Sequence, residues 1–491
     1  MSSSGYDDSD RSMVADASLR PPIHGEGPVP AAAASLLLDF RAYIDGRANA
    51  TTAWSNTRAG DRISVTFWPA HPPRVSHFSV FCPDLNPGDD FAEEPYIMAA
   101  EDDVVLLCVV QGPFADRDSF NYFVYQAGGC MPSSLKLLNH PGPSRIFHGC
   151  NVGLLRSKGS DGFYVIAALC YTSMVPGHYD LYTYDSRTEE WATKLALMRQ
   201  EQELGHHSSH SHTKVITLGG KAGTMGWVDL WRGILFCDVL RHQDDHTVPL
   251  CYVALPPPLQ PDTNMQAGPG AARDIAVVSG RIKYVELQIH VRPGSVADGD
   301  FISDDWTAAT WSRKATSVKY LEKAGSWQPG CKVRASQISA RKKKPAQFEL
   351  LPKLVDDQGT PQPTLERLHT AHPKLSLHQD NVVYFMTKVH FIKGTKAWVL
   401  AVDVKNKTLQ GVAESDARRT LGMNFTYMCS SISQHLHMAP ATHGQLKRPG
   451  MLMWRASLKK QAGISGRKNQ ESEVEGTSLR ALDQDNMDLD K

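Results

Sequence analysis

Residues 179–191 read Tyr-Asp-Leu-Tyr-Thr-Tyr-Asp-Ser-Arg-Thr-Glu-Glu-Trp, and this stretch decides the class of fold. An alternating aromatic strand runs into an Asp-Ser-Arg-Thr turn, and a Trp follows the turn. The same order returns at 397–412, where Ala-Trp-Val-Leu-Ala-Val-Asp-Val is followed by Lys-Asn-Lys-Thr and Leu-Gln-Gly-Val. A strand ending in Asp, a polar turn and an answering strand form the hairpin unit of a propeller blade. Recurrence of this unit in a long chain predicts radial β repetition.

Similar short runs, most of them β-branched or aromatic, continue from residue 36 to residue 429 and are separated by Gly, Pro, Asp or Asn turns. Convincing amphipathic helices are scarce, and many short strands without helices between them exclude a doubly wound α/β fold. The pattern therefore predicts an all-β fold with a β-propeller-like body over residues 31–440. A four-stranded blade takes roughly 40–50 residues, so about six blades fit this length.

The two ends of the chain differ from the body in composition. Residues 1–30 are rich in Ser, Asp, Gly and Pro, and they hold too few large apolar groups to offset chain entropy. Residues 447–468 carry seven basic residues and no acid, and the last stretch is acidic. Opposite-sign blocks with little apolar content are typical of disorder. We therefore expect disordered tails at 1–30 and 441–491.

The charge balance bounds the kinds of partner. Lys+Arg and Asp+Glu both number 52 in the 491 residues, so the formal net charge is zero. A balanced chain gives no electrostatic reason to expect nucleic acid or an anionic membrane as its main partner. No apolar run approaches the roughly 20 residues needed to span a bilayer. The acidic start also lacks the basic leader of a secretory signal, so we expect an intracellular protein of the cytoplasm, the nucleus or both.

The nine cysteines predict reduced thiols. Their number is odd, their spacing is wide, and no Cys-x-x-Cys pair occurs. Several, such as Cys108 and Cys237, stand inside apolar strand-like runs. Buried free thiols explain this pattern better than disulfides or zinc.

A family resemblance rests on several motifs in the same order. Residues 226–240 read Gly-Trp-Val-Asp-Leu-Trp-Arg-Gly-Ile-Leu-Phe-Cys-Asp-Val-Leu, and Val-Ala-Leu-Pro-Pro-Pro follows at 253–258. This chain resembles the plant family known as domain of unknown function 1618, which is expanded in grasses. Further segments that resemble the family occur at 47–54, 72–76, 306–312, 375–378, 380–385, 397–403 and 406–412.

The resemblance covers roughly residues 35–435, with a family-specific core at about 226–415. It implies a β-propeller-like body related to the domains that follow F-boxes in plants. The family has no established catalytic or binding residues, so the resemblance assigns none to this chain.

A histidine-rich stretch invites a metal-site interpretation. His206, His207, His210 and His212 are close enough in sequence for their imidazoles to converge on one divalent ion. The run is Gly-His-His-Ser-Ser-His-Ser-His, without a carboxylate or thiol close by. A solvated low-complexity loop is therefore the favoured interpretation, and no metal site is predicted.

Three further motifs fail as catalytic or cofactor sites. The run Gly219–Gly223 contains Lys221, but it lacks the Ser or Thr of a phosphate loop and reads as the strand-to-turn pattern of kelch-type blades. The run Gly159–Gly162 lacks the spacing of a nucleophile elbow. Asp102 and Asp103 are adjacent, and adjacent strand residues point to opposite faces. The sequence predicts no catalytic, cofactor-binding or metal-binding residue.

The tryptophans are expected to pack blades together rather than to line a recognition surface, since large rings bury large areas. We predict that Trp231 is core, because it lies in the densest apolar run, and that Asp229 orders a turn. The basic run Arg341–Lys344 is favoured as a solvated face, with nuclear import as the alternative. The other tryptophans considered are Trp191, Trp227, Trp306, Trp311, Trp327 and Trp398.

These observations favour a non-enzymatic protein-interaction module that binds a protein partner, because loops on a rigid scaffold are where binding usually resides. Two alternatives remain open. One is an enzyme with a site in the central propeller funnel, and the other is a nuclear regulatory factor that acts through the basic segments. An enzyme requires several ionisable side chains that converge in one pocket with perturbed pKa values.

Overall fold

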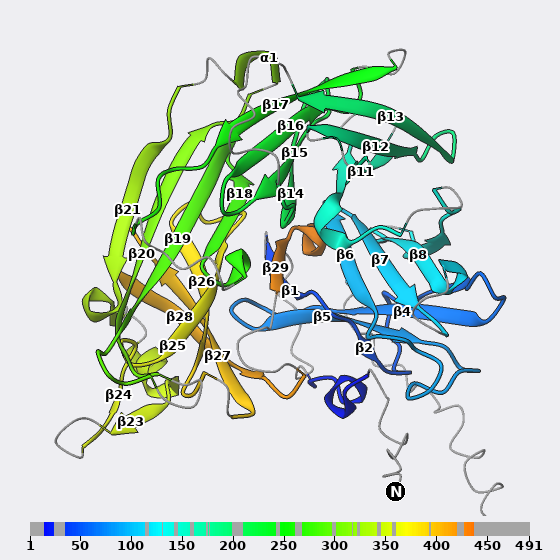
Figure 1. Cartoon of the computed structure of the whole chain (residues 1–491). Helices are drawn as coiled ribbons and strands as arrows, with labels where there is room; N and C mark the ends of the chain where they lie inside the picture. The colour runs from blue at the N-terminus through cyan, green and yellow to red at the C-terminus, as the bar shows by residue number, and fades with distance from the viewer. Residues whose placement is uncertain are drawn as a thin grey trace, which may run out of the picture. The chain divides into compact units, whose positions relative to one another are not determined.

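The computed structural model describes residues 14–23, 35–112, 117–129, 131–141, 146–157, 162–172, 175, 177–198, 210–241, 246–260, 268–296, 301–316, 318–321, 325–340, 345–355, 360–391, 394–419 and 427–436. These residues form an all-β body (Figure 1). The helices in the described ranges are short: α1 (Val318–Leu321) and the 3-10 segments η1 (Asp16–Leu19), η2 (Arg117–Ser119), η3 (Gly149–Asn151), η4 (Pro269–Ala271), η5 (Ala335–Gln337), η6 (Pro345–Leu350) and η7 (Ile432–His435). None of them has the length and apolar character that crossing a membrane requires.

The first sheet joins the two ends of the body. Its strand order is β29-β1-β5-β4-β3, and β2 also pairs with β5. β29 is antiparallel to β1, with Ser430 opposite Leu36, whereas β1 and β2 both run parallel to β5. The bounds are β1 (Leu36–Asp39), β2 (Tyr43–Ile44), β3 (Ala53–Asn56), β4 (Arg62–Trp68), β5 (Val75–Phe81) and β29 (Tyr427–Ser430).

The next sheet is a four-stranded antiparallel meander in the order β6-β7-β8-β9. Its strands are β6 (Tyr96–Glu101), β7 (Val104–Val110), β8 (Phe120–Gln126) and β9 (Ser134–Leu137). Every residue of β7 is buried, as its uninterrupted apolar run Val-Val-Leu-Leu-Cys-Val-Val requires.

The largest sheet holds eight strands in the order β10-β11-β12-β13-β17-β16-β15-β14. Two meanders meet where β13 pairs parallel with β17, with Leu195 opposite Thr247. Its end strands β10 and β14 also lie close together, and the Thr217 Oγ1 of β14 donates to the Leu154 carbonyl of β10 at 2.6 Å. The bounds are β10 (Val152–Arg156), β11 (Tyr164–Tyr171), β12 (His178–Asp185), β13 (Glu190–Met198), β14 (Lys214–Gly219), β15 (Thr224–Asp229), β16 (Gly233–Asp238) and β17 (Thr247–Ala254).

Two further sheets and one hairpin complete the described strands. One sheet has the order β18-β19-β20-β21, and the other has the order β22-β28-β27-β26-β25. Their strands are β18 (Arg273–Val278), β19 (Arg281–Val291), β20 (Ser303–Lys314), β21 (Gln328–Arg334), β22 (Ser339–Ala340), β25 (His369–Leu375), β26 (Val382–Lys388), β27 (Lys396–Asp403) and β28 (Thr408–Asp416). The hairpin pairs β23 (Lys353–Val355) with β24 (Pro361–Pro363).

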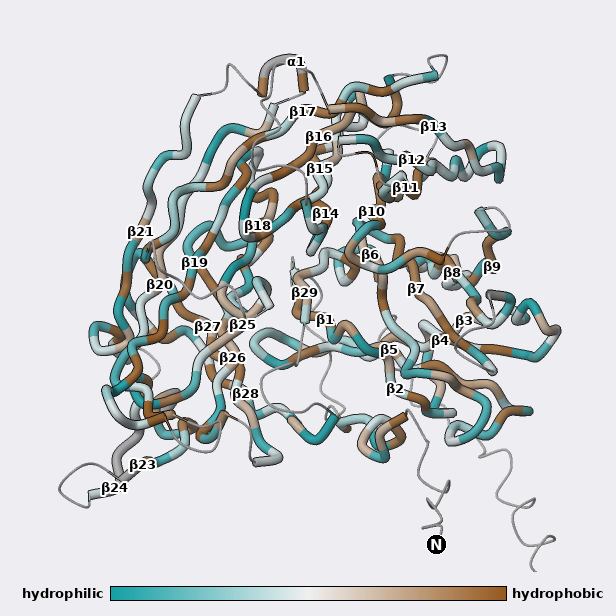
Figure 2. The backbone as a smooth tube through the Cα atoms, viewed as in Figure 1, coloured by the Kyte–Doolittle hydropathy of each residue, from teal (hydrophilic) through white to brown (hydrophobic). Residues whose placement is uncertain are grey.

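One strand of each sheet contacts a strand of the next. Contacts join β6 to β10, β14 to β18, β18 to β25 and β25 to β29. The apolar clusters of the core fill the space between these sheets, and Trp227, Trp306 and Phe123 are among the fully buried side chains. Figure 2 shows hydrophobic residues along strands such as β7 and β16. The predicted all-β, propeller-like class is confirmed, whereas the number of blades stays a prediction.

The two hairpins that decided the fold class form as predicted. β12 and β13 are paired, with Asp185 opposite Glu190, and the Glu189 amide donates to the Asp185 carbonyl at 2.8 Å. β27 and β28 are paired, and the Asp403 carboxylate accepts the Asn406 amide at 2.9 Å. In both hairpins the Asp that ends the first strand organises the turn, as short polar turn residues do.

The expected tails have different outcomes. Within 1–30, residues 14–23 are ordered, which contradicts disorder for this part. Val14 is 5% exposed and Ser18 is fully buried, and η1 contacts β2. The buried Val14 side chain and the buried hydrogen bonds of Ser18 hold this short segment against the body. Residues 1–13, 24–30 and 441–491 lie outside the described residues.

Candidate functional site

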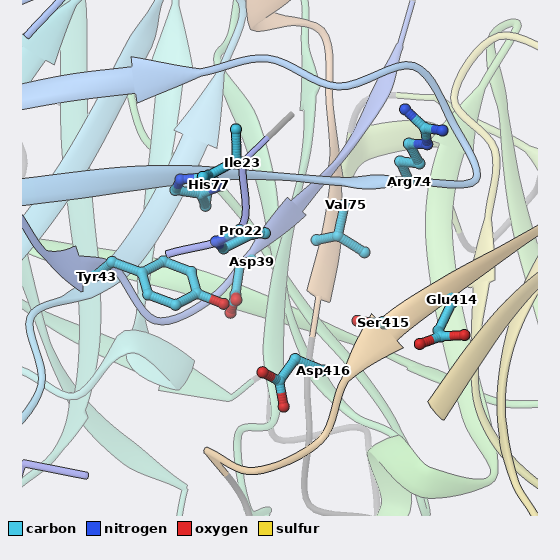
Figure 3. A pocket seen from close by; sticks show the side chains of 10 residues that line it. All are labelled: Pro22, Ile23, Asp39, Tyr43, Arg74, Val75, His77, Glu414, Ser415 and Asp416. Atoms are coloured by element: carbon cyan, nitrogen blue, oxygen red, sulfur yellow. The ribbon is translucent and has the colours of Figure 1, made fainter. Parts of the chain in front are cut away.

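A pocket of about 410 Å³ opens beside β1, β5 and the end of β28 (Figure 3). β1 and β2 pair with the same strand, β5, and the pocket lies at the break between them. β1 pairs with β5 up to Leu38, opposite Ser76, and β2 resumes the pairing at Tyr43, opposite Ser79. The intervening backbone turns to the neighbouring sheet, since the Ala42 amide donates to the Pro95 carbonyl at 2.7 Å. The lining residues are Pro22, Ile23, Asp39, Tyr43, Arg74, Val75, His77, Glu414, Ser415 and Asp416.

Arg419 anchors the buried side of this pocket. Its side chain is 2% exposed and forms ion pairs with Asp39 at 3.0 Å and with Glu94 at 3.6 Å. Its Nε donates to the Ser18 Oγ at 3.0 Å, and its guanidinium carbon lies 3.8 Å from the centre of the Tyr43 ring. One cation therefore binds η1, β1, β2 and the segment after β28 together.

The pKa values at this anchor follow from burial. Burial raises the pKa of Asp39 to about 6, although the neighbouring Arg419 guanidinium lowers it. Burial and the charge of Asp39 raise the pKa of Tyr43 to about 12. The hydroxyl group of Tyr43 points toward the carboxyl group of Asp39 in Figure 3. Asp39 is thus held inside the wall of the pocket rather than presented at its mouth.

The rim of the pocket carries carboxylates in exposed ion pairs. Asp416 accepts two hydrogen bonds from the Arg418 Nε, at 3.0 and 2.9 Å. Burial alone would raise the pKa of Asp416, but the hydrogen bonds and charge of Arg418, together with the charge of Arg419, lower it overall. Glu414 pairs with Lys396 at 2.8 Å, and both side chains are more than half exposed. Figure 3 shows Glu414 and Asp416 on the strand that borders the pocket.

The structure overturns the predicted solvated histidine loop for two of its four members. His210 and His212 are buried, with ring centres 5.1 Å apart, and His212 stacks on Tyr171 at 5.8 Å. Burial and the neighbouring His210 lower the pKa of His212 to about 3. The Ser211 amide donates to the Asp229 carboxylate at 3.0 Å, which fixes this segment against β15. The Ser-rich composition gave no sign of this packing.

His206 and His207 lie outside the described residues. Among the residues that are described, no group of three or more His, Cys, Asp and Glu side chains could hold a metal ion. Eight of the nine cysteines are described, and all eight are free thiols, as the sequence predicted for them. Cys130 lies outside the described ranges.

The tryptophans divide into two groups. Trp227 and Trp306 are fully buried, which confirms packing for these two. Trp231 is only half-buried, so its predicted core position is wrong. It lies in the turn after β15, where the Arg273 guanidinium stacks 4.5 Å from its ring centre. The other tryptophans named in the sequence analysis are all partly buried: Trp191, Trp311, Trp327 and Trp398.

The remaining sequence motifs are structural where they are described. Asp229 orders its turn as predicted, because its carboxylate accepts the Trp231 amide at 2.8 Å. Gly219 and Gly220 have φ values of 70° and 75° in the turn between β14 and β15, where glycine is favoured. Asp103 pairs with Arg156 at 2.7 Å. The basic runs 341–344 and 447–468 and residues 159–161 lie outside the described residues.

Sequence reasoning missed the anchor of Arg419 and Asp39. The two residues are 380 positions apart, so no local pattern joins them. One signal was present: Asp39 ends the apolar run Leu-Leu-Leu-Asp, and a buried charge requires a partner. That rule identifies a buried carboxylate, but it does not identify the cation.

The family comparison covers part of the body. Residues 227–384 match the family described as "Protein of unknown function (DUF1618)". This finding confirms the family resemblance over that segment, which contains the last half of β15, β16 through β25 and the start of β26. The plant origin and the relation to F-box-associated and kelch domains stay predictions. No curated protein matches the chain in sequence.

Solved structures resemble the chain only distantly. The WD40 domain of SCAP from fission yeast is 11% identical over 76% of this chain and 75% of that chain, with a TM-score of 0.29. The α-L-arabinofuranosidase PaAbf62A from Podospora anserina is 10% identical over 69% and 91%, with a TM-score of 0.25. A levansucrase of B. megaterium is 10% identical over 78% and 92%, with a TM-score of 0.25. These scores are too low to carry an argument about substrate or activity.

Proposed function

We propose that this protein is a non-enzymatic interaction module that binds a basic, partly apolar peptide segment of a partner protein in the pocket beside Asp39. The observation that carries this proposal is the pairing of every carboxylate among the described residues that line the pocket. Asp39 is bound by Arg419, Asp416 by Arg418 and Glu414 by Lys396. Carboxylates that are already engaged favour recognition over proton transfer, because a general base needs a free lone pair on the substrate side.

The chemistry of the rim supports a basic ligand. The ion pairs of Glu414 and Asp416 are exposed, and such pairs contribute about 0–1 kcal/mol to folding stability. A lysine or arginine of the partner can therefore replace Lys396 or Arg418 as the cation at little cost in free energy. The pocket also presents apolar surface, because Ile23 is 84% exposed and Val75 lines the same space. A segment that combines a basic and an apolar side chain matches both features.

The architecture supports the scaffold role. We propose that the sheets form about six four-stranded blades, since four-stranded meanders recur at β6–β9, β10–β13, β14–β17, β18–β21 and β25–β28. Pairing of β29 with β1 would then close the ring of blades. A plant origin, a relation to F-box-associated domains and an intracellular location belong to the same proposal.

Selection of random displayed peptides on the full chain tests this proposal. The wild-type protein is expected to enrich peptides that carry Lys or Arg next to an apolar residue. Glu414→Lys should abolish that enrichment, because it reverses the charge at the rim. The matched control is Glu190→Lys, which changes an exposed strand glutamate outside the pocket. Equal enrichment by the wild type and Glu414→Lys, or enrichment of acidic peptides, would contradict the proposal.

A further inference from the structure

A second charge cluster lies where three strands, each at the end of its own sheet, approach one another: β14, β18 and β25. Asp274 of β18 is 1% exposed and pairs with Lys214 of β14 at 2.8 Å. Lys374 of β25 lies 3.7 Å from the same carboxylate oxygen, Oδ1. Strands β14 and β25 both contact β18, and β29 contacts β25. This cluster shares no residue with the pocket beside Asp39.

The cluster holds one more positive than negative charge. The Asp274 Oδ2 accepts the Leu375 amide at 3.0 Å, and its Oδ1 accepts the Lys214 ammonium. Lys214 also donates to the Ile275 carbonyl at 2.7 Å. Lys374 is farther from the carboxylate than a hydrogen bond allows. Among the described residues, no second acid pairs with either lysine.

The surroundings penalise the charge of Lys374. Its side chain is 13% exposed, and burial lowers its pKa. Lys214 lowers that pKa further, and Asp274 compensates only in part. Cys429 beside them is a neutral thiol, since burial raises its pKa to about 12. A buried cation whose counter-charge is shared with a second cation is stabilised by any anion that can reach it.

The backbone next to Lys374 is irregular. The β25–β26 register shifts between Ala371 and Lys374, and His372 has a φ of 51°, which is unusual for a residue with a side chain. The Tyr427 hydroxyl of β29 donates to the His372 carbonyl at 3.3 Å and holds this bulge. Bulges occur beside functional sites, where they redirect a side chain. Holding His372 in this conformation costs stability, and the bulge sets the direction of Lys374 two residues later.

We infer that Lys214 and Lys374 form a binding site for a small oxyanion, that is, a phosphate or carboxylate group. Because the two ammonium nitrogens lie 2.8 and 3.7 Å from one oxygen, they are at most 6.5 Å apart. Two oxygens of a single phosphate group can bridge that separation with charge-assisted hydrogen bonds. Asp274 holds Lys214 by a hydrogen bond and attracts Lys374 over 3.7 Å, and the excess positive charge remains for the ligand.

The test is isothermal titration of the full chain with inorganic phosphate and, separately, with acetate, each against sodium chloride at matched ionic strength. One phosphate is expected to bind per chain. Tighter binding of phosphate than of acetate would identify the phosphate group, and the reverse order would identify the carboxylate group. Lys374→Met should weaken binding by about tenfold or more, the scale of one charge-assisted hydrogen bond.

Three further variants keep the test decisive. Lys283→Met removes a lysine that pairs with Asp380 at 3.3 Å elsewhere, and it should bind phosphate like the wild type. Lys214→Met provides the same test as Lys374→Met from a more exposed position, should Lys374→Met fail to fold. Asp274→Asn removes the competing carboxylate and should tighten binding. No specific binding by the wild type, or unchanged binding in both lysine variants, would show that the cluster is an ion network of structure alone.

Discussion

Two buried charge clusters of this molecule differ in their balance. Arg419 faces two carboxylates, Asp39 and Glu94, and gives its remaining donors to neutral acceptors. Asp274 instead faces two ammonium groups, Lys214 and Lys374. In the first cluster the acceptors satisfy the cation, so it can serve structure alone. In the second a positive charge is left over, and leftover charge in a partly closed site is suited to a ligand.

The largest effect is expected at Arg419. Arg419→Met removes the ion-pair partner of the buried Asp39 and leaves Glu94 paired with the more exposed Arg41 at 3.4 Å. Removal of one partner of a buried pair costs about 3–5 kcal/mol. Urea denaturation of the full chain measures this loss of unfolding free energy. Arg418→Met is the matched control, because Arg418 pairs with Asp416 at the surface, where about 1 kcal/mol or less is expected. Equal losses in the two variants would contradict a structural role for the Arg419 cluster.

His212 sharpens the comparison, since it is buried and no acid among the described residues pairs with it. Its pKa falls to about 3 in the folded state, whereas the unfolded chain binds the proton near its ordinary value of 6.5. As the pH falls, the unfolded chain therefore binds a proton at His212 at a higher pH than the folded protein does. The free energy of unfolding decreases as the pH falls from about 6.5 toward 3. Between pH 7 and pH 4 this amounts to about 3 kcal/mol.

Comparison of His212→Leu with the wild type isolates that effect. The difference in unfolding free energy between the two proteins should change steeply with pH from 6.5 to 4 and stay flat above pH 7. Parallel curves over the whole range would mean that His212 is accessible to protons in the folded protein, and would restore the solvated-loop interpretation.

Ser18 tests whether residues 14–23 belong to the first cluster. Its Oγ accepts from Arg419 and donates to Glu94, and the side chain is fully buried. Ser18→Ala should lower the unfolding free energy by about 1–2 kcal/mol, because it leaves a buried donor unsatisfied. The exposed hydroxyl of Ser279, which donates to Asp380, provides the control. Thermal denaturation that does not distinguish Ser18→Ala from Ser279→Ala would return this segment to a dispensable tail.

The smallest effect is expected at Lys374. Lys374→Met removes the surplus cation and leaves Asp274 paired with Lys214 and the Leu375 amide. In a buffer without phosphate its unfolding free energy should stay within about 1 kcal/mol of the wild type, far from the loss at Arg419. A loss as large as that of Arg419→Met would show that both clusters are equally structural.

The sequence predicted the local features of this fold because local chemistry determines them. Two hairpins have a first strand that ends in Asp, at Asp185 and Asp403, and a further turn forms at Asp229. Each of these turns depends on residues within a few positions of one another. Trp231 was misplaced because apolar density does not show where β15 ends, and the turn moves Trp231 out of the core that holds Trp227.

The candidate sites could not be predicted because they join distant positions. Lys374 and Asp274 are separated by 100 residues, and Arg419 and Asp39 by 380. The parallel pairing of β13 with β17 is equally non-local, since it depends on how two meanders meet. His210 and His212 were misjudged because composition describes a segment's average, whereas these two rings pack against particular strands.

Linkage between phosphate and stability tests the contrast between the two clusters most directly. The unfolding free energies of the wild type, Lys374→Met and Arg419→Met are measured with and without inorganic phosphate, at matched ionic strength. A ligand that binds only the folded state stabilises it by mass action. We predict that phosphate stabilises the wild type and Arg419→Met equally and stabilises Lys374→Met much less, as binding weakened by about tenfold or more requires. Stabilisation of all three by the same amount, or of none, would contradict the assignment of the surplus charge at Lys374 to a ligand.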